Sequence, residues 1–391
     1  MQTPPSLAWG ECHLLYLRGG IEKVKNIMRK RCYIVLVVIV GWLVGCLAGC
    51  GKATSRADAD TTPAGRELIA DARFERGMAL SPLWPHIVQQ GGGFSRTCTD
   101  TLRFAECDLK PIWQLCQWSS RYDLAGAEAM AQGDEVAFAN EGKRVALAED
   151  GTLTLGLTTS REYDHPRKAD EPWTHLLVQQ DFDSPPHIDE IEALHFAMEL
   201  KVDYCHNRLG EAFDEEIHTA QAPFYLMVRN GNKESKDYGL GLWVGIPTFD
   251  YRYKRLADTE TIHWDVGTAT YIYTIPPRKV WGDVDLGDGE WHKAARDILP
   301  LVLRALEAMR EKGCFMDSAP EDLAITGMNF GWEIPGTFDA ELRMRGLSLR
   351  AEEIQNSKLR EINSRFLLAA RQRVFTLSAL APQRRFKIQN F

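Results

Sequence analysis

Four short segments of the chain place hydrogen-bonding side chains beside aromatic rings, in stretches whose other residues alternate as in β-strands. The segments are Trp173-Thr174-His175 and residues 218–229, 243–252 and 329–333. Side chains two positions apart in a strand point to the same face. Polar and aromatic groups within each segment can therefore gather on one surface of a sheet.

Rings beside amide, guanidinium and carboxyl groups suit one class of ligand in particular. A sugar has apolar ring faces for stacking, and its edges carry hydroxyl groups that both donate and accept hydrogen bonds. We therefore expect a carbohydrate ligand on one face of the protein. The residues predicted to bind it are Gln221, Tyr225, Trp243, Asp250, Arg252 and Trp332.

The same region leaves catalysis open. Glu333 and Asp250 are candidates for the two carboxyl groups of a glycoside hydrolase, in which their separation would set the stereochemical outcome. Alternatively, His175 and His218, with Tyr225, are the residue types with which a polysaccharide lyase removes a proton beside a uronate carboxyl. A third hypothesis, a protein-binding module of the cell envelope, predicts no glycan pocket at all.

One acidic segment contains hard oxygen ligands in close succession. Asp283, Asp285 and Asp288 lie among glycines, as in a calcium-binding loop, so Ca²⁺ is a candidate ligand. The spacing departs from that of an EF-hand loop because the third acid comes one position late. A solvated acidic turn is the alternative, and the sequence indicates no other cofactor.

The elements that must position these residues are mostly strands, because most apolar patterns between residues 67 and 350 have a period of two. The strongest runs from Leu194 to Val202, and Gly346 is expected to form a β-bulge in the last strand. The other predicted strands are 134–138, 144–148, 153–157, 173–181, 220–229, 240–246, 269–275, 323–332 and 340–349.

One segment has a helical period instead. Apolar residues recur every three or four positions from Trp291 to Met309, which predicts an amphipathic helix bent near Pro300. About ten antiparallel strands and one attached helix predict a mainly β fold. The expected fold class is an antiparallel β-sandwich, of jelly-roll or concanavalin-like type, with the helix packed on it.

Leu47-Ala48-Gly49-Cys50 closes an apolar run and resembles the bacterial lipobox, in which the cysteine is lipidated. The run is shorter than the roughly 20 apolar residues that span a bilayer. The resemblance implies export and membrane attachment through a lipid on Cys50, at the outer membrane in a Gram-negative cell. It also implies a signal peptide at 28–49 after an extension at 1–27, then a flexible spacer at 50–66.

The distribution of charge along the chain bears on its binding partners. The net charge is −8, with an acidic body and a basic tail at 351–391 that is expected to be helical or disordered. An acidic body repels phosphate backbones, so nucleic acid is not expected as a partner.

Five cysteines follow Cys50, which is an odd number: Cys98, Cys107, Cys116, Cys205 and Cys314. One disulfide is expected among the first three of them.

Residues 120–350 loosely resemble the exported carbohydrate-binding and carbohydrate-active β-sandwich domains of bacteria, on strand pattern rather than on a motif. Residues 188–192 superficially resemble the Glu-x-Asp-x-Glu strand of concanavalin-fold glucanases. They depart from it because Ile188 replaces the first glutamate. We therefore expect a polar turn there. The resemblance implies a glycan ligand for the sandwich and leaves binding and cleavage as alternatives.

Overall fold

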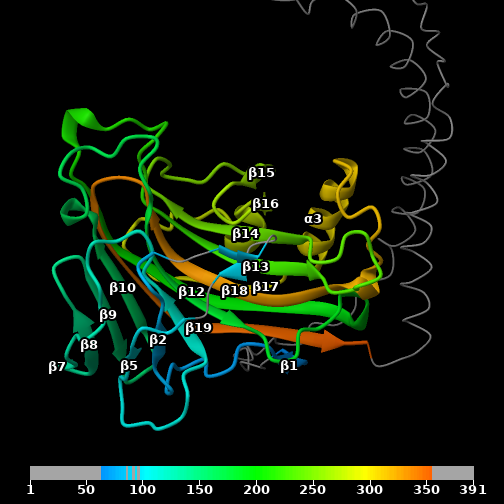
Figure 1. The fold of residues 1–391 in the computed structure, drawn as a ribbon, viewed down its shortest axis with the longest axis horizontal. Coiled ribbons are helices and arrows are strands. Elements are labelled where there is room, and N and C mark those ends of the chain that lie inside the picture. The colour runs from blue at the N-terminus through cyan, green and yellow to red at the C-terminus, as the bar shows by residue number, and fades with distance from the viewer. Residues whose placement is uncertain (1–62, 85–86, 90–92, 95–96, 355–391) are drawn as a thin grey trace, which may run out of the picture. The chain divides into compact units, whose positions relative to one another are not determined.

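A computed structural model describes residues 63–84, 87–89, 93–94 and 97–354. Two packed sheets make up most of this part (Figure 1). The eight-stranded sheet has the order β17 (His292–Asp297), β12 (Ile191–Asn207), β19 (Phe338–Glu353), β10 (Leu153–Thr158), β9 (Lys143–Ala148), β8 (Glu135–Ala139), β7 (Met130–Gln132), and β1 (Arg66–Glu67) also pairs with β19.

The nine-stranded sheet carries the predicted functional residues. Its order is β15 (Thr261–Asp265), β16 (Thr270–Thr274), β14 (Gly241–Asp250), β13 (Gln221–Asn230), β18 (Leu323–Ile334), β11 (Thr174–Asp181), β6 (Trp113–Cys116), β2 (Met78–Leu80), β5 (Thr101–Leu102). A separate hairpin joins β3 (Ile87–Gln89) to β4 (Gly93–Phe94).

The predicted fold class is confirmed: the chain is mainly β, and its two sheets form a sandwich. All ten strands predicted from the period of two are present. Pairing is antiparallel except between β14 and β16 and between β2 and β6, where the strands run parallel. The short strands at the start of the chain, together with β7, β15 and β17, were not predicted, because most of them have too few residues to show a period.

The longest pairing, between β12 and β19, holds the middle of the eight-stranded sheet. The predicted bulge is present in it, since Ala197 and Glu199 pair with Ser348 and Arg345, so that β19 has one extra residue there. Gly346 lies in this interval at a φ of 61°, a left-handed conformation that glycine adopts readily. Residues 188–190 form a 3-10 turn that leads into β12, as expected from the polar sequence.

The core lies between the sheets and draws alternate residues from each strand. On β18 these are Met328, Phe330, Trp332 and Ile334, all fully buried. The indole Nε1 of Trp332 donates a hydrogen bond of 2.9 Å to the backbone oxygen of Leu155 in β10. This contact crosses the sandwich, so it ties the two sheets to each other as well as filling space between them.

The predicted helix begins later than its apolar period suggested. Residues 292–297 form β17, which pairs with β12, and α3 spans Leu299–Glu311. Pro300 lies in the first helical turn, where its missing N–H costs nothing, so it starts the helix rather than bending it. The buried stripe of α3, with Val302, Leu306 and Met309 at its centre, packs into the core. The shorter α2 spans Arg278–Trp281.

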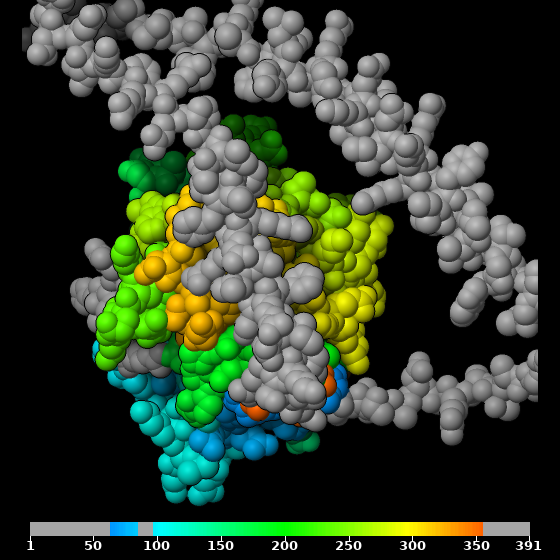
Figure 2. All heavy atoms as spheres, turned by 90° about the vertical axis from the view of Figure 1, so that its right-hand side faces the viewer, coloured from blue at the N-terminus to red at the C-terminus, as the bar shows by residue number. Residues whose placement is uncertain are grey.

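Loops from distant parts of the chain meet beside α3. The loop after β13 lies against the segment after α3, as the neighbouring green and orange surfaces of Figure 2 show. Ser235 donates a hydrogen bond of 2.6 Å to the backbone oxygen of Asp317, and the backbone N–H of Lys236 donates one to its carboxylate. Four 3-10 turns complete the described elements: Thr159–Arg161, Ile188–Glu190, Gly210–Ala212 and Pro320–Asp322.

The expected disulfide is not formed. Cys98, Cys107, Cys116, Cys205 and Cys314 are all free thiols. Cys116 lies fully buried within β6, whereas Cys98 is exposed in a loop, where its Sγ donates to the backbone oxygen of Asp100. Regular spacing along the chain therefore did not bring the first three cysteines together as a bridge.

Several predictions about the ends of the chain lie outside the described residues. They include the lipobox with Cys50, the segments 1–27 and 28–49, most of the spacer at 50–66, and the tail from residue 355 onward. Residues 351–353 belong to β19. Within the described part of the chain, neither helix has the length and apolar character needed to cross a membrane.

Replacing Trp332 with phenylalanine should lower the free energy of unfolding by about 1–3 kcal/mol. The Leu155 oxygen loses its side-chain donor, and the smaller ring leaves a void in the core. Trp264→Phe is the matched control because Trp264 is 49% exposed, so it should change stability by no more than about 0.5 kcal/mol. Urea unfolding of both variants measures the difference. Equal losses would contradict a bridging role for Trp332.

Candidate functional site

The central strand β18 divides its side chains between two surfaces. Met328, Phe330 and Trp332 enter the core, whereas Asn329 and Glu333 point to the opposite face of the nine-stranded sheet. We call this opposite surface the Glu333 face. Its members on neighbouring strands, identified by register and by their separation from the main core, are His175, Leu177 and Gln179 on β11, Gln221, Tyr225 and Met227 on β13, Trp243 on β14 and Ile272 on β16.

Glu333 is the buried carboxyl group of this face. It is 8% exposed and pairs in register with His175 on one side and Gln221 on the other. The amide Nε2 of Gln221 donates a hydrogen bond of 2.9 Å to its Oε2. Burial raises the pKa of Glu333 to about 7, and the negative charge of Asp265 adds to this effect, while the Gln221 hydrogen bond opposes it. Glu333 can therefore hold a proton near neutral pH.

His175 lies beside Glu333 and is uncharged at neutral pH. Burial lowers its pKa to about 4 by disfavouring the imidazolium form. Its ring centroid lies 5.9 Å from that of Trp118, in an edge-on arrangement, and its backbone N–H donates to the Trp118 oxygen. Among the described residues, the ring nitrogen Nδ1 is buried without a hydrogen-bond partner.

An aromatic pair adjoins Gln221 along the sheet. Tyr225 and Trp243 have ring centroids 5.4 Å apart and pack with Ile272 and Met227 in a small cluster separate from the main core. Gly245 permits this arrangement, because a Cβ at that position would lie 3.1 Å from the Tyr225 ring. Burial raises the pKa of Tyr225 well above its usual value, with added effects from Glu333 and Asp265, so the phenol keeps its proton.

Asp265 is a site residue that sequence reasoning missed. It ends β15 and pairs in register with Thr270, whose strand neighbour Ile272 belongs to the Glu333 face. Its negative charge adds to the raised pKa values of Glu333 and Tyr225 and opposes the lowering of the pKa of His175. The backbone N–H of Thr268 donates to Asp265 over 2.8 Å. The sequence feature that could have identified Asp265 is an acidic residue just before the turn at Gly267.

The predicted pair Asp250 and Arg252 contact each other. Arg252 donates from Nη2 to Asp250 Oδ2 over 2.6 Å, and the Thr219 hydroxyl donates to Oδ1 over 2.6 Å. In the sheet, Gln221 lies between Asp250 and Glu333, so their backbones are two strand spacings, or about 10 Å, apart. The structure thus does not bring Asp250 and Glu333 into direct contact.

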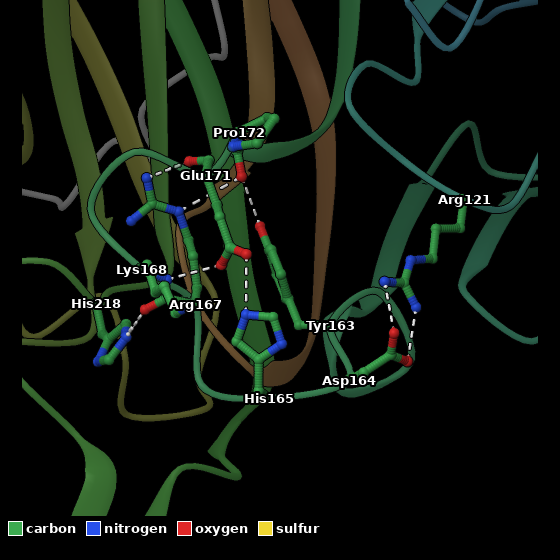
Figure 3. Close-up of polar contacts among 9 residues, drawn as sticks. All are labelled: Arg121, Tyr163, Asp164, His165, Arg167, Lys168, Glu171, Pro172 and His218. Carbon is green, nitrogen blue, oxygen red and sulfur yellow. Dashed lines mark hydrogen bonds and ion pairs between the residues drawn. The ribbon is translucent and has the colours of Figure 1, made fainter.

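Both ring nitrogens of His218 are engaged by the backbone. Its Nδ1 accepts a hydrogen bond of 3.0 Å from the backbone N–H of Asp214, and its Nε2 lies 2.7 Å from the backbone oxygen of Arg167. Figure 3 shows the ring beside the 163–172 loop, in which the Arg167 guanidinium donates hydrogen bonds to the backbone oxygens of Glu171 and Pro172. Because both ring nitrogens are engaged, His218 has no free nitrogen to act as a base.

The structure corrects the assignment of Trp332 as a ligand-binding ring. Trp332 is fully buried, and its indole N–H is bonded across the sandwich to Leu155. It follows Gly331 and precedes Glu333, so the strand period directs it away from the Glu333 face. A ring next to Glu333 in sequence therefore cannot share a ligand with it.

Gly331 allows β18 and β11 to approach closely between Asn329 and Glu333. Its φ is 147°, and a Cβ there would lie 2.2 Å from the Leu176 oxygen and 2.9 Å from the Leu177 Cα. Leu176 directly follows His175. The absence of a side chain at residue 331 thus sets the distance between the strands that carry Glu333 and His175.

The acidic turn contains three carboxylates with partners of their own. Asp283 forms an ion pair with Arg255, and Asp285 accepts from the backbone N–H of Gly287 over 3.1 Å. Asp288 contacts His292 Nε2 at 2.9 Å. In the described ranges no three His, Cys, Asp or Glu residues are arranged to hold a metal ion.

No protein-family model matches the chain, and neither does any curated protein. Solved structures do match. An endoglucanase from Rhodothermus marinus is 12% identical and aligns over 58% of this chain and 97% of its own, with a TM-score of 0.33. A family 12 xyloglucanase from Bacillus licheniformis is 7% identical over 58% and 97%, with a TM-score of 0.35.

A third match is the xyloglucanase domain of a type three effector from Sinorhizobium fredii, solved in complex with cellobiose. It is 9% identical and covers 59% of this chain and 100% of its own, with a TM-score of 0.32. At such identities and scores, these similarities carry no conclusion about the activity of the present chain.

Replacing Glu333 with glutamine should remove a pH-dependent part of the stability. A carboxyl with a raised folded-state pKa stabilises the fold fully below its ordinary value of 4.5, and this contribution is lost as the pH rises through about 7. The free energy of unfolding of the natural chain, relative to Glu333→Gln, should thus fall by about 3 kcal/mol between pH 4.5 and 7.5. Urea unfolding across this range measures it, and a constant difference would show that Glu333 is not buried as described.

Proposed function

We propose that the protein binds a neutral glycan on the Glu333 face, as an exported protein held to the membrane by a lipid on Cys50. The observation that carries the proposal is the Glu333 carboxyl itself. It is buried, holds a proton near neutral pH and is bonded to Gln221 beside the Tyr225–Trp243 ring pair. A protonated carboxyl, an amide and a phenol are neutral groups that both donate and accept hydrogen bonds, as sugar hydroxyls require.

The charges around this face favour a neutral ligand over an anionic one. His175 is uncharged at neutral pH, Tyr225 keeps its proton, and Asp265 contributes a negative charge. Arg229, two positions beyond Met227 on β13, is a cationic side chain on this side of the strand, at the end away from Glu333. Beside Glu333 a uronate or sulfated polymer would be repelled by Asp265, and the Arg229 guanidinium lies eight residues further along β13 than Gln221.

Hydrolysis of the bound glycan is the second candidate function. It is favoured by the pKa of about 7 at Glu333, because a general acid must carry a proton at the working pH. Asp265, whose charge reaches Glu333, would supply the second carboxylate in place of Asp250. A lyase mechanism has less support, since both nitrogens of His218 are bonded to the backbone.

Binding should depend on Trp243. Trp243→Ala removes one ring of the pair and should weaken the binding of a neutral polysaccharide about tenfold or more, a change of about 1.4 kcal/mol. Affinity electrophoresis of the full chain in detergent, through gels containing β-glucan, xylan or galactomannan, measures the effect. The matched control is Trp264→Ala, at an exposed tryptophan that directly precedes Asp265 in β15. This variant should bind normally. Unretarded migration of the natural chain in all three gels would exclude the proposal.

Cleavage should depend on Glu333. If the chain is a hydrolase, Glu333→Gln should lower the release of reducing ends by roughly 10²–10⁴-fold while polysaccharide binding persists. Glu234→Gln, at an exposed loop residue, is the matched control and should retain full activity. If the natural chain binds a polysaccharide but releases no reducing ends from it, the result would support a binding protein and rule out the hydrolase.

A further inference from the structure

Asn329 is a buried polar residue of the Glu333 face to which the proposed function gives no role. Its side chain is 0% exposed. Within the described part of the chain, neither its Oδ1 nor its Nδ2 has a hydrogen-bond partner. A buried carboxamide in this state costs stability, because it has given up water on both atoms without replacing it. Folding alone therefore does not explain an asparagine at this position.

The neighbours of Asn329 are polar groups aligned across four strands. It pairs in register with Tyr225 of β13 and with Gln179 of β11, and Gln179 pairs in turn with Gln114 of β6. The row adjacent to it along β18 contains Gln221, Glu333 and His175. Since four residues of a strand span about 13 Å, the two rows lie within the length of a short oligosaccharide.

A second unpartnered atom lies on the same surface. The Nδ1 of His175 is buried without a partner among the described residues, and His175 is opposite Glu333 in register. The unsatisfied groups are thus at both ends of the segment from Asn329 to Glu333. Gln221, His175 and Met227 are half-buried rather than fully buried, so the face is open to solvent at these three positions.

We propose that the carboxamide of Asn329, once the groups that cover it are displaced, binds two neighbouring hydroxyl groups of the glycan and so helps to select the sugar. This inference rests on the proposed function and extends it along β18. A carboxamide has one acceptor oxygen and two N–H donors, and two adjacent hydroxyls can donate to the first and accept from the second. A carboxylate or an ammonium group on the ligand would satisfy one end of the amide and leave the other unpaired.

The first test measures stability and needs no ligand. Asn329→Leu replaces the carboxamide with an apolar group of similar size, so the urea midpoint should stay the same or rise. Asn230→Leu is the matched control. Asn230 is also 0% exposed, but its Nδ2 donates to Ser235 and Ser318 and its Oδ1 accepts from the backbone of Asn232. The control should lower the midpoint strongly. A comparable fall for Asn329→Leu would show a structural role, such as holding a buried water, and would overturn the inference.

The second test measures binding to β-glucan, xylan and galactomannan by affinity electrophoresis of the full chain. Asn329→Leu should lose about tenfold or more in affinity for the preferred polysaccharide, or change the order of preference. Binding by the natural chain that Trp243→Ala abolishes and Asn329→Leu leaves intact would overturn the role of Asn329 alone. Failure of the natural chain to bind any of the three would overturn the proposed function, and the assignment of Asn329 with it.

Discussion

Water is largely excluded from the Glu333 carboxyl in the middle of the nine-stranded sheet, and the protonation states of the site residues follow from this. Glu333 is on β18, which has β13 on one side and β11 on the other, so the side chains of Gln221 and His175 flank its carboxyl. Burial is the largest cause of its raised pKa and of the lowered pKa of His175. Burial therefore favours the uncharged forms of both Glu333 and His175, while Asp265 contributes a negative charge.

Much of the fold could be predicted from the sequence, because a strand with one buried face shows a period of two that few other structures produce. This worked for long strands such as β12 and for the bulge at Gly346. It failed for two-residue strands such as β5 and for β17, whose Ala294 and Ala295 continue the apolar spacing of the helix after Pro300. Periodicity cannot mark the residue at which a strand stops and a helix begins when small residues fit both.

The site was less predictable, because it depends on pairing between strands that are distant in sequence. Five of the predicted residues share one face of the sheet: His175, Gln221, Tyr225, Trp243 and Glu333. The strand register that brings them together was not visible in the sequence. The inward direction of Trp332 could, in contrast, have been predicted, because adjacent residues of a strand point to opposite faces and Trp332 is next to Glu333. Asp265 and Asn329 were missed since their importance comes from what surrounds them rather than from a motif.

Gly331 has a consequence for how this protein can evolve. Any other residue there would introduce a Cβ within 2.2 Å of a β11 oxygen, in a backbone conformation that L-amino acids rarely adopt, and would force apart the strands that carry His175 and Glu333. Position 331 is therefore restricted to glycine. New ligand preferences can arise through substitutions at Asn329 and on β13, β14 and the β15–β16 hairpin, while Gly331 and the buried carboxyl stay in place.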